Sequence, residues 1–224
     1  MKTHRKISLT AGLLYVLTFV SIPTLALYSQ VKGANYILSS GPDTRAVISG
    51  LLEIIVALAG IATAVVLFPM LKKKNESAAL GLVAARILES GMIFIGVAFL
   101  STVVVLRRTG VGADALASSH LLSALYDRTF LLSQSFMPAI CDLILGILLF
   151  KSRLIPRGLA MVGIIGAPIL IVSYLTVLFG GVEQHAKISG AAAFPVALFE
   201  LSLGLWLIFK GFNPKAVADL ESAN

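Results

Sequence analysis

The sequence predicts an all-α integral membrane protein, built as a bundle of six transmembrane helices. Three observations lead to this prediction: 58% of the 224 residues are hydrophobic, only 13% are charged, and the mean hydropathy is +0.95. A soluble domain carries about 25% charged residues, and half of that fraction cannot cover a water-facing surface. The apolar residues are instead gathered in long runs that are bordered by charged or helix-breaking residues.

The expected spans form a single domain, residues 1–212, which is followed by a short polar cytoplasmic tail, residues 213–224. A helix that crosses the hydrocarbon core of a bilayer needs about 20 mostly apolar residues. Six runs of the sequence meet this requirement: residues 7–28, 46–71, 79–106, 129–150, 158–179 and 190–209.

The first run follows a basic start and is expected to be a retained helix rather than a signal peptide. It is longer than the core of a signal peptide, which has about 7–15 residues, and no clear A-x-A site closes it. The second run ends at three lysines, residues 72–74, and the third ends before Arg107 and Arg108. Such charges mark the point at which a helix leaves the hydrocarbon core.

The last three runs are followed by helix-breaking residues. Pro156 blocks direct continuation of the fourth helix, Gly180 follows the fifth, and Gly211 follows the sixth. Residues 113–126, before the fourth run, mix leucines with polar residues. They are expected either to form an interfacial helix or to extend the fourth helix outward.

The distribution of basic residues predicts that both termini lie in the cytoplasm. With the N-terminus inside, the inner segments carry eleven Lys and Arg residues and the outer segments carry six. This excess is what the positive-inside rule requires, and only the pair Arg107 and Arg108 argues against it. Because these cations lie at the ends of apolar runs, the net charge of +7 predicts contact with membrane lipids and no nucleic-acid partner.

Ionisable residues inside the apolar runs are the strongest functional signal. A charge at the centre of a membrane helix costs about 2.5–3.5 kcal/mol, so such residues face the bundle interior or water. At a rise of about 1.5 Å per residue, four of them lie about 10–15 Å from a helix end, near the middle of a core about 30 Å thick. These four form the expected midplane polar cluster: Arg86, Glu89, Asp142 and Glu200.

Two accessory residues and two interpretations belong to this cluster. Ser90 is next to Glu89 on the third helix, whereas Glu53 lies toward the outer end of the second. One arginine cannot neutralise three acids, so at least one acid is expected to be protonated or to meet water or a cation. A proton- or cation-responsive cavity and a dry clamp that only holds the helices together both stay open.

Familiar enzyme motifs are absent from the sequence. It contains no H-E-x-x-H, G-x-S-x-G, Walker A or G-x-G-x-x-G pattern, so no catalytic residue, cofactor or metal site is predicted. The single cysteine, Cys141, lies in an apolar run and is interpreted as a small buried hydrophobe. The absence of these motifs leaves room for an unfamiliar membrane enzyme.

Several short motifs are similar to those of one known family. The opening of the first run (ISLTAGLLYVLT, residues 7–18), the step R-I-L-E at residues 86–89 and the turn F-K-S-R-L-I-P-R at residues 150–157 carry the likeness. On these residues the chain resembles the bacterial membrane protein family catalogued as domain of unknown function 4386. The resemblance implies a six-helix protein of the bacterial cytoplasmic membrane, and it carries over no activity.

We therefore expect a multi-pass membrane protein that handles or senses a small solute or protons through the midplane acids. A non-catalytic structural or regulatory subunit with a protein partner is the alternative, and a lipid-modifying enzyme is a third. Lys151, Arg153 and Arg157 form a turn that is expected to contact lipid headgroups.

Overall fold

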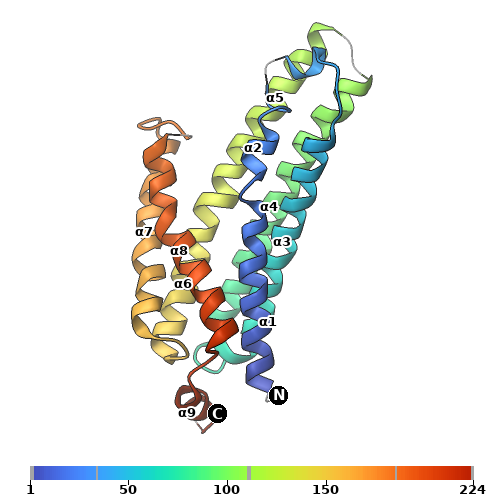
Figure 1. Cartoon of the computed structure of the whole chain (residues 1–224). Helices are drawn as coiled ribbons and strands as arrows, with labels where there is room; N and C mark the ends of the chain where they lie inside the picture. The colour runs from blue at the N-terminus through green and yellow to red at the C-terminus, as the bar shows by residue number, and fades with distance from the viewer. Residues whose placement is uncertain (1–2, 34, 110–111, 185, 223–224) are drawn as a thin grey trace.

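The computed structural model of the chain describes residues 3–33, 35–109, 112–184 and 186–222, and within these ranges it contains helices and no strand (Figure 1). Six helices are long and apolar enough to cross a membrane, which confirms the predicted class and the number of candidate spans: Thr3–Tyr28, Thr44–Leu71, Glu76–Thr109, Asp114–Ser152, Arg157–Leu178 and Lys187–Phe209. Large apolar side chains on these helices, such as Leu58 and Phe194, are exposed. Both termini lie at one end of the bundle, here called the termini end. Which side of a membrane this end faces stays a prediction.

The first span is broken in its second half. It consists of α1 (Thr3–Thr18), a single 3-10 turn η1 (Phe19–Ser21) and the short α2 (Thr24–Tyr28). Pro23 precedes α2 and has no backbone N–H to continue the ladder of hydrogen bonds. The hydroxyl groups of Thr18 and Thr24 donate instead to carbonyls three residues earlier. The chain therefore changes direction within the span.

The second and third spans form an antiparallel pair, α3 (Thr44–Leu71) and α4 (Glu76–Thr109). With 34 residues, α4 is about 50 Å long, well beyond a hydrocarbon core of about 30 Å. Figure 1 shows α4 and α5 rising beyond the tops of α7 and α8. The bundle is consequently taller on one side than on the other.

The fourth span is one long, nearly continuous helix. It runs through α5 (Ala113–Leu131), a π-helical turn η3 (Leu132–Phe136) and α6 (Met137–Ser152). Residues 113–126 thus extend the fourth helix outward and do not form a separate interfacial helix. The helix begins well before the apolar run at residues 129–150, and Ala115, Ser119 and Tyr126 of this extension are buried.

The last two spans, α7 (Arg157–Leu178) and α8 (Lys187–Phe209), are held close to their neighbours by glycines. A Cβ atom at Gly12 of α1 would lie 2.7 Å from the carbonyl oxygen of Gly204 of α8. A Cβ atom at Gly163 of α7 would lie 2.8 Å from the ring of Phe199. Small residues that allow such close approach are the usual contact points of membrane helices.

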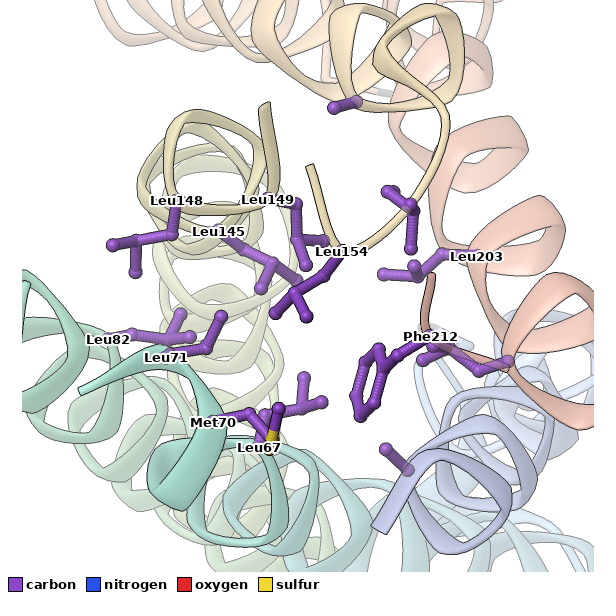
Figure 2. Packing of buried hydrophobic residues seen from close by; sticks show 14 of the residues in the cluster. Leu67, Met70, Leu71, Leu82, Leu145, Leu148, Leu149, Leu154, Leu203 and Phe212 are labelled. Carbon is purple, nitrogen blue, oxygen red and sulfur yellow. The ribbon is translucent and has the colours of Figure 1, made fainter. Parts of the chain in front are cut away.

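A packed apolar core fills the termini end of the bundle. Figure 2 shows its leucines from four helices and a connecting turn closing around Phe212. The tail, expected to be short and polar, forms the helix α9 (Pro214–Ser222), and its apolar side is buried in this core. Glu221 of α9 lies 3.0 Å from His4 and 3.6 Å from Lys73. Ala216, Val217 and Leu220 are spaced so that they share one face of α9. This spacing indicates a buried helix face, although the overall composition of the tail is polar.

The opposite end of α4 carries a compact ionic cluster around Asp43. Its carboxylate pairs with Arg107 at 3.0 Å and with Arg108 at 2.8 Å, and it also accepts a hydrogen bond from the hydroxyl group of Tyr36. The two arginines that argued against the predicted orientation are thus paired with an acid from the neighbouring connection. Burial opposes ionisation of Asp43, but the hydrogen bonds from Tyr36 and Arg108 and the two guanidinium charges lower its pKa below the ordinary value.

We predict that Asp43→Asn destabilises the protein at neutral pH and that the loss disappears in acid. Because the pKa of Asp43 is lower in the folded than in the unfolded protein, its contribution is present above about pH 4 and is lost as the pH falls through the folded value. The thermal midpoint in detergent should fall by a few degrees at neutral pH. Asp219→Asn, at an exposed position of α9, is the control. Equal midpoints for the two variants at neutral pH would contradict the prediction.

Candidate functional site

The structure gathers the four midplane residues around the guanidinium group of Arg86. Nη1 of Arg86 donates to both carboxylate oxygens of Glu89, at 3.0 Å each, within α4. Nη2 donates to Oε1 of Glu200 on α8 at 2.8 Å and lies 3.7 Å from Oδ1 of Asp142 on α6. One side chain of α4 therefore links that helix to two others.

Burial separates the three acids into different roles. Asp142 has no exposed surface and Glu89 is 6% exposed, whereas the side chain of Glu200 is 15% exposed. Neither oxygen of Asp142 accepts a hydrogen bond from the described residues. A buried carboxylate without donors is strongly disfavoured, so the lone guanidinium cannot support three ionised acids. Two acids need a proton or a further cation.

Neighbouring side chains that the sequence did not indicate complete this cluster. The Sγ of Cys141 donates to Oε2 of Glu89 at 3.3 Å, so this thiol does more than fill space. The guanidinium carbon of Arg86 lies 6.0 Å from the centre of the buried Tyr15 ring on α1. Ser90, expected beside Glu89, donates instead to the carbonyl of Ala57 at 2.8 Å and ties α4 to α3.

Glu53 forms a second, separate polar site in the half of the bundle away from the termini end. Its carboxylate is 1% exposed and accepts hydrogen bonds from the Tyr126 hydroxyl at 2.7 Å, the Gln134 amide at 3.0 Å and the Tyr28 hydroxyl at 3.3 Å. The two tyrosine rings meet edge to face, with centroids 5.2 Å apart. Three neutral donors satisfy Glu53, which does not join the cluster around Arg86. A glutamine inside an apolar run was the one available sequence signal.

A cleft opens directly onto the Arg86 cluster. It has a volume of about 220 Å³, and Arg86, Glu89 and Glu200 line it together with apolar residues from α3, α4, α7 and α8. The break of the first span also borders it, through residues 18–22. Asp142 is not among the lining residues. The cleft is thus an apolar hollow with one guanidinium and two carboxyl groups on its wall.

A second hollow of about 320 Å³ continues the cleft away from the termini end. The two share Gln134, Leu170 and Ala193, and the second reaches Gln184 and Ala186 in the connection between α7 and α8. Gln134 lies in the π-helical turn η3, a local irregularity that is frequent at functional sites. The second hollow therefore lies next to the cleft, on its side toward the connection between α7 and α8.

The three basic residues of the expected headgroup turn lie at the termini end, remote from the cluster. Arg153 and Arg157 line one hollow of about 570 Å³, and Lys151 lines another with Lys74. No group of three His, Cys, Asp or Glu residues that could hold a metal ion occurs in the described part of the chain. The Arg86 cluster, with three acids around one guanidinium beside a cleft, is the candidate site among the described residues.

Comparison with known proteins identifies one family. The family model described as "Domain of unknown function (DUF4386)" matches residues 10–211, which include both polar sites and all six candidate spans in whole or in large part. No curated protein and no solved structure matches the chain.

We predict that Arg86→Gln strongly destabilises the protein. The change leaves Glu89 and Glu200 without their donor, and removing one member of a buried ion pair costs about 3–5 kcal/mol. Thermal unfolding in detergent measures the loss, with the exposed Arg45→Gln of α3 as the control. Adding Glu89→Gln and Glu200→Gln should restore most of the stability. An Arg86→Gln variant that unfolds at the same thermal midpoint as the Arg45→Gln control would contradict this prediction.

We also predict that Glu200 and Asp142 differ in their access to water. In a Cys141→Ala background, a Glu200→Cys variant should react rapidly with a small hydrophilic alkylating reagent, because position 200 lines the cleft. An Asp142→Cys variant should react slowly, since position 142 is fully buried behind Arg86. Mass spectrometry of the folded protein follows the labelling. Equal reactivity at both positions, fast or slow, would contradict the described cleft.

Proposed function

The chain belongs to the DUF4386 family, whose description assigns no activity, and we propose from the geometry of its cleft that this multi-pass membrane protein binds a small amphipathic solute with a positive charge. In this proposal Glu200 pairs with the charge of the solute. The single observation that carries the proposal is the position of Glu200, which is the most exposed acid of a cluster with surplus acid and lines a cleft whose wall is mostly apolar.

The charge of the solute follows from the charges of the cluster. Arg86 already donates to Glu89 and Glu200, and Asp142 lies within 3.7 Å of the same guanidinium. An anion in the cleft would meet two acids, Glu89 and Glu200, and one arginine that is already engaged. A cation would instead supply the missing positive charge, and in a medium of low dielectric constant that attraction is strong.

The size and polarity of the solute follow from the walls. A volume of about 220 Å³ is below the roughly 300–1,000 Å³ of sites for drug-sized ligands. Phe19, Ile93 and Leu170 are among the apolar residues that line the cleft. These features favour a compact apolar body that carries one cationic group, such as an aromatic or alkyl amine.

The charge count of the cluster also favours a cation. One guanidinium faces three acids, so the cluster holds more acidic groups than Arg86 can pair. Tyr15 and Cys141 are the other ionisable groups that face these acids, and neither supplies a positive charge.

The closed termini end supports binding or sensing rather than a continuous passage. The apolar core around Phe212 lies between the cluster and the termini, and α9 covers it. A dry clamp, in which Arg86 only joins α4 to α8, is the structural alternative and requires no ligand.

We predict that the purified protein binds benzyltrimethylammonium, a compact apolar cation, and that Glu200→Gln weakens this binding at least tenfold, which corresponds to about 1.4 kcal/mol. Isothermal titration calorimetry measures both affinities. Glu76→Gln removes the same charge at an exposed position of α4 and should change nothing. A parent protein that does not bind the cation, or a Glu200→Gln variant that binds it equally well, would overturn the proposed function.

A further inference from the structure

A basic hollow lies at the termini end of the bundle, on the far side of the apolar core from the cleft. The turn between α6 and α7 forms one wall, and the end of α8 with the connection to α9 forms the other. Its volume is about 570 Å³, and its side chains include Arg153, Arg157, Lys210 and Trp206. The turn and α8 are far apart in the sequence, so only the fold brings these groups together.

The three cations of this hollow have no acidic partner. No acid lines the hollow, and none of Arg153, Arg157 and Lys210 forms an ion pair with a described residue. The guanidinium group of Arg157 lies over the ring of Phe150, 5.0 Å from its centre. Like charges that converge without a counter-charge repel each other. An anion would remove that repulsion.

The backbone of the turn is held in place before any ligand arrives. Leu154 and Ile155 are buried in the apolar core, and the backbone N–H of Asn213 donates to the carbonyl of Leu154 at 2.9 Å. Arg153 has φ of 56°, and it is the one residue other than glycine with positive φ among those described. A left-handed residue commonly ends a helix, as Arg153 ends α6, although it is usually glycine because a Cβ atom makes this conformation costly. The backbone that carries the cations of the hollow is therefore preformed.

We propose that this hollow binds a phosphate group through Arg153, Arg157 and Lys210. Guanidinium groups match the geometry of phosphate oxygens, and lysine adds a point charge. Trp206 lies one helical turn before Lys210, and tryptophan is enriched where membrane helices meet the headgroup layer. The phosphate can come from an anionic phospholipid or from a soluble phosphate compound. Lys151, which the sequence grouped with this turn, lines the separate hollow beside Lys74 and is not part of the site.

Trp206 makes the proposal testable because it is the only tryptophan of the chain. In vesicles of phosphatidylcholine that contain a small fraction of brominated lipid, its fluorescence reports which lipid lies against the hollow. We expect brominated phosphatidylglycerol to quench Trp206 at least twice as strongly as brominated phosphatidylcholine at the same mole fraction. Equal quenching by the two lipids would overturn a lipid headgroup as the ligand.

The variant Arg153→Gly combined with Lys210→Gln should abolish this preference. Glycine removes the guanidinium group and suits a positive φ, and Lys210 is exposed, so the fold is preserved. Lys72→Gln combined with Lys74→Gln removes the same charge at the same end and should keep the preference, because neither residue lines the hollow. A preference that survives in the first variant, or that the control loses equally, would overturn the site.

Inorganic phosphate distinguishes the two sources of the ligand. In detergent without added lipid, millimolar phosphate is compared with chloride at equal ionic strength. A change in Trp206 fluorescence with phosphate alone, absent from the Arg153→Gly and Lys210→Gln variant, supports a site that also takes soluble phosphate. A lipid preference without this response supports a site for the phospholipid headgroup. A protein that shows neither response contradicts the proposal.

Discussion

The pairing of Arg86 with acids from three helices is the interaction on which the arrangement of the bundle depends. A guanidinium group in the middle of a membrane helix is tolerated only when acids surround it. Glu89 is supplied by the same helix, but Asp142 and Glu200 require α6 and α8 to lie within reach of α4. The close contact of Gly12 with Gly204 makes this possible for α8, because it brings α1 and α8 together one turn below Glu200.

The two ends of the bundle differ because the helices are regular on one side of the cluster and irregular on the other. Toward the termini, regular helices and α9 pack leucines and Phe212 into one apolar core. Away from the termini, the break at Pro23 and the π-helical turn at residues 132–136 interrupt two neighbouring spans. Interrupted helices cannot pack along their full length, and the cleft lies beside these interruptions.

The sequence predicted the fold and the midplane cluster for the same physical reason, which is the cost of charge in lipid. That cost fixes how long a span must be and requires that its buried charges meet. Features that depend on tertiary packing carried no such signal. Tyr28 comes from the first span, whereas Tyr126 and Gln134 come from the fourth, so their convergence on Glu53 was not visible. The π-helical turn has no sequence signature, and the pairing of Arg107 with Asp43 joins the end of α4 to the connection before α3.

The two buried acidic sites show why the presence of a carboxyl group inside a membrane does not by itself identify a binding site. Glu53 accepts three hydrogen bonds from neutral donors, so its environment already satisfies it, and nothing further is required there. Asp142 accepts none and shares one guanidinium with two other acids. The unsatisfied charge lies with the second site, and its carboxyl groups Glu89 and Glu200 line a cleft. Incomplete satisfaction combined with access, rather than burial of charge alone, is therefore the reason to propose a binding role for the Arg86 cluster and a structural role for Glu53.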